Sequence, residues 1–461
     1  MRKLWELLRT ALSGAEHDYT SMGVRRAIVL LSIPMILEMG MEALFALVDL
    51  YWVGRLGDDA TATIGLTESL LMTTYCVAWG LAMGATAVVA RRTGEKDAEG
   101  MRVAAGQSLL IALVLGLLLS AVGSVFSSDL LRAMGASDAV VDGGGGYARI
   151  MQASNVVIML LFTVNAVFRG AGNPGMALRA LGFANILNIV LDPLLIMGIG
   201  PFPELGVTGA AVATTTGRTC GVLYQLYFLL RPGGPFALRA AHLRWVRTTA
   251  LNILKVSAGS VGQFLIASAS WTVLVKIIAT AGTAAVAGYT TAVRIIIFTL
   301  LPAWGMANAA ATLVGQNLGA GSADRARRST WLCGHYNTAF MVVVAAVFWL
   351  AAGPIVAFFG NSAEANGYAV DALRIISLGY FFYGYGMVLA QAFNGAGDSL
   401  TPTWMNLVCF WCMEIPLAWL LAVGMDLGPN GAFASVAISE SALAVLSAWI
   451  FRQGRWARAQ V

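Results

Sequence analysis

Long apolar runs along the whole chain limit what this sequence can fold into more than any other feature. A helix that crosses a bilayer needs about 20 apolar residues, and twelve stretches meet that length. Each stretch is continuous, whereas the strands of an outer-membrane barrel alternate apolar and polar residues over about 10 positions. We therefore expect an all-α integral membrane protein with twelve transmembrane helices. The expected helices cover residues 26–53, 61–90, 100–126, 145–168, 176–198, 206–230, 248–280, 284–317, 325–359, 366–393, 401–424 and 429–451.

The chain carries too few charges to fold in water. Asp, Glu, Lys and Arg make up 11% of its 461 residues and hydrophobic residues make up 58%, while soluble domains carry about 25% charged residues. This composition excludes a soluble globule, a nucleic-acid-binding protein and a coiled coil. The five cysteines lie in or beside apolar runs and their number is odd, so we expect no disulfide framework.

Lysine and arginine concentrate in alternate connections between the expected helices. Of 29 such residues, 21 fall in the N-terminal segment, in every second connection or in the C-terminal tail, and Arg169 and Arg179 are counted in one of these connections. Positive residues mark the cytoplasmic side of a membrane protein. Because the number of spans is even, we expect both termini in the cytoplasm of a bacterial or archaeal cell, with the helices in its inner membrane. The basic excess is thereby explained without a nucleic-acid partner.

The two halves of the chain repeat each other at an offset of 225 residues. The offset aligns Ala78-Trp79-Gly80 with Ala303-Trp304-Gly305, and Phe168-x-Gly170-Ala171-Gly172 with Phe393-x-Gly395-Ala396-Gly397. Each half holds six spans, so both copies have the same orientation in the membrane. We expect two six-helix lobes related by a pseudo-twofold axis along the membrane normal, with a cleft between them that suits a transporter. A channel subunit can be duplicated as well.

The repeat and the charge pattern together define the expected segments of the chain. These are a cytoplasmic amphipathic N-terminal segment at 1–25, an N-lobe at 26–230, a cytoplasmic linker at 231–247, a C-lobe at 248–451 and a cytoplasmic tail at 452–461. Within the first segment, residues 1–14 have the pattern of an amphipathic helix on the bilayer surface.

Acidic residues lie inside several spans of the first half, where a charge costs about 2.5–3.5 kcal/mol on insertion scales. Glu38, Glu42 and Asp49 fall within about 40° of one another at about 100° per residue, so they form one narrow stripe that cannot face lipid. We expect Asp49 to be functional. For Glu38, Glu42 and Glu68, pairing with internal charges for a structural purpose is an equal alternative.

A second polar group lies on the fifth expected helix. Asn188 and Asp192 are four residues apart and share a face, and the following Pro193 frees a backbone carbonyl. Carboxylate, amide and carbonyl oxygens suit a proton or a small hard cation. We therefore expect the coupling ion in the first half of the chain.

The second half differs in charge from the first. It carries Glu414 and Glu440 but no acid in residues 252–321, and among the ionisable residues expected to be buried there are Lys276 and Arg294. For these four residues, internal ion pairing and contact with a substrate are both open.

Motifs for soluble catalysis are missing from the chain. No GxxxxGK[ST], HExxH or GxSxG pattern occurs, which argues against an ATPase motor, a zinc protease and a serine hydrolase. The glycine run from Gly143 to Gly146 is not followed by GK[ST] and is interpreted as a flexible loop. We expect no enzymatic activity and no cofactor.

Several longer stretches resemble the multidrug and toxic compound extrusion (MATE) family. They are Pro34 followed by Ala46-Leu47-Val48-Asp49-Leu50-Tyr51-Trp52-Val53-Gly54-Arg55-Leu56-Gly57, the turn Phe168-Arg169-Gly170-Ala171-Gly172-Asn173-Pro174, and Asn188-Ile189-Val190-Leu191-Asp192-Pro193-Leu194-Leu195 with Gly200-Pro201-Phe202-Pro203 and the run from Leu205 to Thr214. The similarity covers essentially the whole chain, and the last stretch is its most specific part.

The resemblance implies a two-lobe secondary antiporter that works by alternating access. Such a protein exports amphipathic, often cationic, drugs or toxins in exchange for H⁺ or Na⁺. The resemblance also implies that Asp49, Asn188, Asp192 and Thr214 form the cation-coupling site of the N-lobe and the ligands of any bound Na⁺. The expected partners are small toxic organic compounds and membrane lipid, and the expected functional unit is a monomer.

The chain departs from part of the family pattern. One branch also uses an acid on the seventh helix, where this chain offers Gln263 and Lys276. This difference favours the branch similar to DNA-damage-inducible protein F, with coupling in the N-lobe. Glu38 and Glu42 match no position of the pattern.

Two other functions are alternatives to antiport. A flippase for lipid-linked precursors belongs to the same superfamily of folds, but it commonly has more spans and a cationic cavity for pyrophosphate, which the acids of the first half would repel. A channel or receptor would not concentrate its ligand at the expense of an ion gradient.

Overall fold

The structure, a computed structural model, describes residues 9–12, 17–234, 236–360, 362–459 and 461. All regular elements in these residues are helices, as the apolar runs predict. The amphipathic segment predicted at residues 1–14 lies largely outside the described residues.

The chain divides into two compact units, called unit 1 and unit 2. The main part of unit 1 is residues 37–258, and unit 2 holds residues 19–36 and most of 259–460. Both boundaries fall inside long helices, α2 (Val24–Val53) and α10 (Arg247–Ala279), so each of these helices contributes residues to both units. In α2 the boundary follows Pro34, which lies inside the helix.

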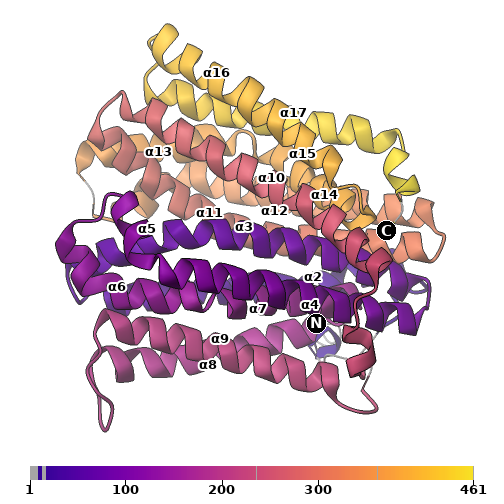
Figure 1. Cartoon of the computed structure of the whole chain (residues 1–461). Coiled ribbons are helices and arrows are strands. Elements are labelled where there is room, and N and C mark those ends of the chain that lie inside the picture. Colours follow the sequence, from indigo (N-terminus) through magenta and orange to yellow (C-terminus); the bar gives the residue numbers. More distant parts are fainter. Residues whose placement is uncertain (1–8, 13–16, 235, 361, 460) are drawn as a thin grey trace. The chain divides into compact units, whose positions relative to one another are not determined.

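Unit 1 contains the helices that follow α2, and unit 2 contains those that follow α10 (Figure 1). In unit 1 they are α3 (Asp58–Gly94), α4 (Ala98–Val125), α5 (Ser127–Ala133), α6 (Asp138–Ala153), α7 (Asn155–Gly170), α8 (Pro174–Ile196), α9 (Val207–Leu230) and η1 (Ala240–Leu243). In unit 2 they are α11 (Thr283–Gly319), α12 (Ala323–Ala357), α13 (Ala363–Ser377), α14 (Tyr380–Ala396), α15 (Leu400–Asn406), η2 (Leu407–Glu414), α16 (Ile415–Trp419), η3 (Leu420–Gly424), α17 (Pro429–Arg452) and η4 (Arg455–Arg458).

Each of the twelve predicted spans coincides with a helix or with a run of consecutive helices. In the described part of the chain, ten helical segments are long and apolar enough to cross a membrane, and the pair α13 and α14, bent by 62°, makes eleven. The remaining predicted span is α9, a helix of 24 residues that is less apolar because it carries Arg218 and several threonines. The prediction of an all-α integral membrane protein is confirmed.

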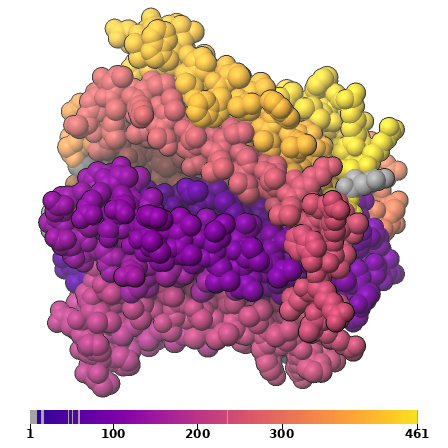
Figure 2. All heavy atoms as spheres, in the orientation of Figure 1, coloured from indigo at the N-terminus to yellow at the C-terminus, as the bar shows by residue number. Residues whose placement is uncertain are grey.

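Small residues bring the helices of unit 1 into close contact. Helix α8 packs against α9, and the two are seen as an adjacent pair in Figure 1. A Cβ atom on Gly209 of α9 would lie 2.3 Å from the carbonyl oxygen of Leu195 of α8, so only glycine permits this approach. The space-filling view shows that side chains close the gaps that a ribbon leaves between α4, α6 and α7 (Figure 2).

The glycine run Gly143 to Gly146 lies within helix α6, so the interpretation of this run as a loop was wrong. The structure gives a physical reason for one of these glycines, because Gly144 permits a close contact between helices. A Cβ atom on Gly144 would lie 2.3 Å from the Thr63 side chain of α3.

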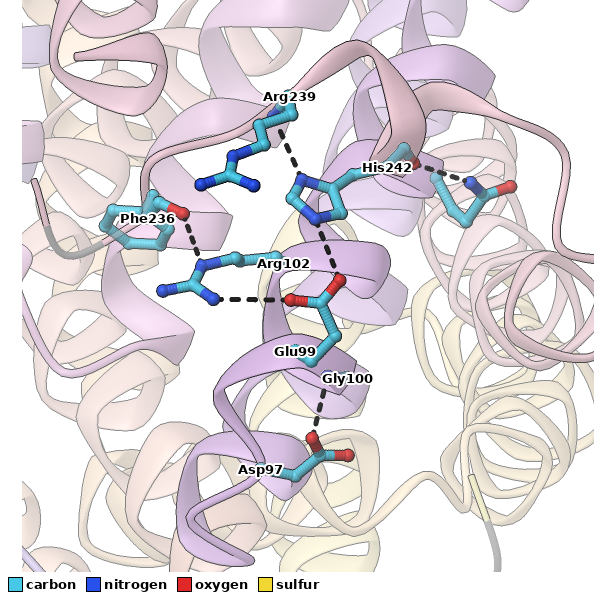
Figure 3. A network of polar contacts seen from close by, with 8 residues as sticks. Asp97, Glu99, Gly100, Arg102, Phe236, Arg239 and His242 are labelled. Carbon is cyan, nitrogen blue, oxygen red and sulfur yellow. Dashed lines mark hydrogen bonds and ion pairs between the residues drawn. The ribbon is translucent and has the colours of Figure 1, made fainter. Parts of the chain in front are cut away.

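The segment that follows α9 is held on the start of α4 by a network of polar contacts (Figure 3). Arg102 Nε donates to the carbonyl of Phe236 at 2.7 Å, and Gln107 Nε2 donates to the carbonyl of His242 at 3.0 Å. His242 Nδ1 accepts from the backbone N–H of Arg239, so His242 Nε2 carries the hydrogen and donates to Glu99 Oε1, with the nitrogen and the oxygen 2.9 Å apart. This segment is therefore part of unit 1.

The internal repeat is present at the level of single contacts. A Cβ atom on Gly170 of α7 would lie 3.1 Å from the carbonyl oxygen of Thr86 in α3. At the same offset of 225, a Cβ atom on Gly395 of α14 would lie 2.2 Å from the carbonyl oxygen of Ala311 in α11. Both halves thus use one glycine to bring the same pair of helices together.

Candidate functional site

Helices α8 and α9 form a buried polar group in unit 1. Asn188 and Asp192 lie one turn apart on α8, and Asn188 Nδ2 donates to Asp192 Oδ1 at 3.1 Å and to Thr214 Oγ1 of α9 at 3.4 Å. Asn188 and Asp192 are fully buried and Thr214 is 4% exposed. The two residues that the sequence groups on α8 and the threonine that the resemblance adds therefore lie together.

This group presents oxygen atoms that have no protein partner. Asn188 Oδ1, Asp192 Oδ2 and Asp49 Oδ1 are buried and accept no hydrogen bond. Asp49 of α2 lies close enough to Asp192 for the two charges to interact. Unpaired buried oxygens of this kind suit a proton or Na⁺, so the residues present fit the expected ion. In the described residues, no three His, Cys, Asp or Glu side chains gather as metal ligands.

An arginine that the sequence reasoning missed lies beside these acids. Arg218 is one turn beyond Thr214 on α9 and is 8% exposed. Its Nη1 donates to Tyr75 Oη at 3.1 Å, and its guanidinium lies 4.9 Å from the ring centroid of Phe45. It interacts electrostatically with Glu42 and Asp49. The sequence could have identified Arg218, because an arginine inside a membrane span needs a partner as much as an acid does.

The two acids without a family counterpart face arginines. Glu38 Oε1 accepts from Arg169 Nη1 at 2.7 Å, and both side chains are at most 5% exposed. Arg169 lies near the end of α7, so counting it among the residues of a connection was wrong. Glu42, which is partly buried, interacts with Arg218 and Arg169. For Glu38 the geometry is that of a structural ion pair.

Aromatic residues surround the same part of unit 1. Tyr75 stacks on Trp79 with ring centroids 5.7 Å apart, and Phe162 packs edge-on against both rings. Tyr147 of α6 is buried and interacts with Asp49, Glu68 and Arg218. Glu68 itself is exposed on α3. No sequence pattern distinguishes Tyr75 or Tyr147 from the many other aromatic residues of the chain.

The second-half candidates are spread over several environments. Gln263 is buried in α10 and accepts from Asn394 Nδ2 at 3.2 Å. Lys276 and Arg294 are exposed, so the expectation that they are buried was wrong for both. Neither forms an ion pair with Glu414 or Glu440 in the described part of unit 2, so internal pairing of these four residues is not observed.

Comparisons with known proteins identify the family. The MatE family profile matches residues 34–194 and 260–420, which are one segment in each repeat. The chain belongs to the MatE family. Its resemblance to the MATE family, inferred from the sequence, is therefore confirmed.

The MatE family match extends to relatives of similar length. A probable multidrug resistance protein NorM of Thermotoga maritima is 25% identical over 95% of this chain and 94% of its own. A probable NorM of Pseudomonas aeruginosa is 28% identical over 88% and 84%. An FAD transporter of Shewanella oneidensis is 24% identical over 88% and 89%.

Solved structures of transporters share the fold. A MOP superfamily transporter from Pyrococcus furiosus has a TM-score of 0.89 and is 26% identical, with 99% of this chain and 98% of that chain covered. A MATE crystal structure in the bent conformation has a TM-score of 0.87 at 27% identity, covering 98% and 96%.

Proposed function

We propose that this protein is a secondary antiporter that exports amphipathic organic cations in exchange for H⁺ or Na⁺, with the coupling ion bound at Asp49, Asn188, Asp192 and Thr214. The observation that carries the proposal is the set of three buried oxygens without partners, on Asp49, Asn188 and Asp192. Membership of the MatE family and relatives named as multidrug resistance proteins support the export of drugs or toxins.

The proposed mechanism is competition for negative charge. The coupling ion binds at Asp49 and Asp192, and a cationic compound binds near the same acids. Binding of one weakens binding of the other, because both neutralise the same carboxylates. Each ligand then favours a different state of the transporter, and the ion gradient drives export by shifting their populations.

We further propose that the protein lies in the inner membrane with both termini in the cytoplasm, because most lysines and arginines fall in one set of connections. A single chain carries both repeats, which supports a monomer as the working unit. Fusing a fluorescent protein that matures only in the cytoplasm to the C-terminus tests the orientation.

Purified protein in liposomes with an imposed pH or Na⁺ gradient tests the transport function. A fluorescent organic cation should be concentrated against its own gradient, and dissipating the ion gradient should abolish this. A flavin nucleotide belongs in the same assay, because one relative is named an FAD transporter and, for the Pyrococcus furiosus relative, a reversed polarity of the binding pocket suggests a different function. Gradient-driven movement of the flavin alone would refute the organic-cation substrate.

The ion site is tested by substitutions that keep shape and remove charge. Asp192→Asn and Asp49→Asn should each reduce gradient-driven export at least about tenfold, the loss that corresponds to about 1.4 kcal/mol. Asp142→Asn is the matched control, because Asp142 is an exposed acid of the same unit. Export by both variants at the rate of this control would exclude Asp49 and Asp192 as coupling residues.

A further inference from the structure

Two glutamates of unit 2 lie inside helices, and each has a buried carboxylate oxygen without a hydrogen-bond partner among the described residues. Glu414 is 1% exposed, and Glu414 Oε1 and Glu440 Oε2 are buried and accept no hydrogen bond. The two carboxylates lie close enough for their charges to interact. No lysine or arginine in the described part of the chain pairs with either of them. Two like charges in a membrane interior require a counter-charge, and the described residues do not provide it, so a bound cation is the source that we consider.

A small cavity adjoins these glutamates. Its volume is about 40 Å³, and Glu440 lies in its wall. Its larger lining side chains are those of Trp271, Tyr289, Tyr380 and Tyr383. The charge of Glu414 acts on Tyr289 and Tyr383, two of the tyrosines that line this cavity.

The size of the cavity decides between ligand classes. About 10–15 Å³ is enough for one water molecule, whereas sites for drug-sized compounds measure about 300–1,000 Å³. A cavity of about 40 Å³ therefore admits a small ion with its water but excludes an amphipathic organic compound.

The internal repeat gives these glutamates the positions of unit 1 site residues. A Cβ atom on Gly431 of α17 would contact Leu421, as one on Gly209 of α9 would contact Leu195, so the two helix pairs meet in the same way. Glu414 precedes Leu421 by the same number of residues as Asn188 precedes Leu195, so Glu414 corresponds to Asn188. Glu440 follows Gly431 by the same number of residues as Arg218 follows Gly209, so Glu440 corresponds to Arg218. The position that supplies an internal cation in unit 1 thus supplies a second acid in unit 2.

The backbone around Glu414 is itself irregular. Glu414 is the last residue of the π-helical segment η2, which is followed by Pro416. Widened helical turns of this kind occur frequently at functional sites. This local geometry is independent of the acidic cluster and of the cavity.

We propose that Glu414 and Glu440 form a second cation site, located in unit 2, that binds one small inorganic monovalent cation, H⁺ or Na⁺. Carboxylate and tyrosine oxygens are suitable hard ligands for either ion. The inference rests on the proposed antiport function only for the use of the ion in transport. Binding at this site does not require Asp49 or Asp192.

The test uses the full-length protein carrying Asp49→Asn and Asp192→Asn, so that the unit 1 site does not respond. Na⁺ is titrated against N-methylglucamine at constant ionic strength while tryptophan fluorescence and the thermal midpoint are followed. Infrared spectra recorded over a pH series detect a protonated carboxyl group by its C=O stretch. Glu414→Gln and Glu440→Gln are added singly, with Glu364→Gln as the control because Glu364 is an exposed acid of the same unit.

A saturable Na⁺ response that is weakened at least tenfold by either glutamine variant identifies the ion as Na⁺. A protonated carboxyl band that either variant removes, without a Na⁺ response, identifies it as H⁺. The proposal is overturned if neither signal occurs, or if the signal survives both glutamine variants. If one glutamine variant does not fold, the other decides the test, and a signal that this variant leaves unchanged overturns the proposal. Glu440→Asp keeps the carboxylate and should retain cation binding.

The two proposals fail separately. Cation binding here in a protein that transports nothing refutes the antiport function and leaves the unit 2 site standing. If neither glutamine variant changes gradient-driven export and no binding signal occurs, the unit 2 site is refuted and the antiport function stands.

Discussion

The same pair of positions is ionic in unit 1 and neutral in unit 2. Glu38 and Arg169 form a buried ion pair at 2.7 Å in unit 1. The positions 225 residues later are Gln263 and Asn394, which are joined by a hydrogen bond of 3.2 Å. The contact of α2 with α7 in unit 1 thus has a counterpart in the contact of α10 with α14 in unit 2, but the charged side chains are replaced by neutral ones. Conservation of the scaffold does not require conservation of its electrostatics.

The two units also differ in how their buried acids are balanced. In unit 1, Arg169 and Arg218 lie beside Glu38, Glu42 and Asp49. In unit 2, Glu414 and Glu440 have no arginine or lysine partner in the described residues. Unit 1 therefore supplies part of its own positive charge, whereas in the proposed site of unit 2 the positive charge comes from a bound cation.

The largest expected effect comes from breaking the ionic pair of unit 1. Arg169→Asn leaves Glu38 as a buried charge without its partner, which should lower the free energy of unfolding by about 3–5 kcal/mol. Gln263→Leu in unit 2 should cost only about 1 kcal/mol, because Asn394 keeps its hydrogen bond to Gln391 at 3.3 Å. Thermal unfolding of the purified variants in detergent measures both.

The double variant Glu38→Gln with Arg169→Asn copies the pair of unit 2 into unit 1 and is the control. It should recover most of the stability that Arg169→Asn loses. If the single and double variants unfold at the same temperature, the charge of Glu38 is not what destabilises the single variant.

The next effect concerns the glycine contact that both units share. Gly395→Ala places a Cβ atom 2.2 Å from a backbone oxygen, whereas Gly170→Ala places one at 3.1 Å. Overpacking of this kind costs about 1–3 kcal/mol, and we expect Gly395→Ala to fall at the upper end and Gly170→Ala at the lower. Gly182→Ala, with open space around it, should stabilise α8 slightly. Equal unfolding midpoints for all three would show that the contact geometry does not limit stability.

Much of this fold could be predicted from the sequence, because each determinant is local. Apolar runs of sufficient length specify spans, and one constant offset specifies the repeat. The residues that counter the acids could not be predicted in the same way. Arg169 was assigned to a connection because it lies near the end of a run, and Lys276 and Arg294 were expected to be buried. Which charges meet depends on how helices rotate and pack, and this is not encoded in the composition of any single helix.

The arginine of unit 1 offers a direct way to make the two units more alike. Arg218→Gln removes the internal cation near Asp49 and Glu42. A cationic dye should then bind about tenfold more tightly, equivalent to about 1.4 kcal/mol, and should be exported more slowly because release is slower. Arg218→Lys keeps the charge and should bind the dye nearly as the unmodified protein does. Fluorescence anisotropy of the dye measures the affinity, and equal affinities in the two variants would contradict the role of the charge.

The smallest expected effect separates two neighbouring threonines of α9. Thr214 Oγ1 accepts a hydrogen bond from Asn188, whereas Thr215 Oγ1 is buried and unpaired. Thr214→Val should weaken binding of the coupling ion by about 0.5–1.5 kcal/mol, or about two- to tenfold, because Asn188 loses an acceptor and is less firmly oriented. Thr215→Val removes a hydroxyl group that has no partner, so ion affinity should not change and stability should be equal or higher. Titration of both variants in a Glu414→Gln and Glu440→Gln background assigns the change to unit 1, since unit 2 no longer contributes. A loss of affinity that is equal in the two threonine variants would mean that packing of α9, and not the hydroxyl group of Thr214, supports the site.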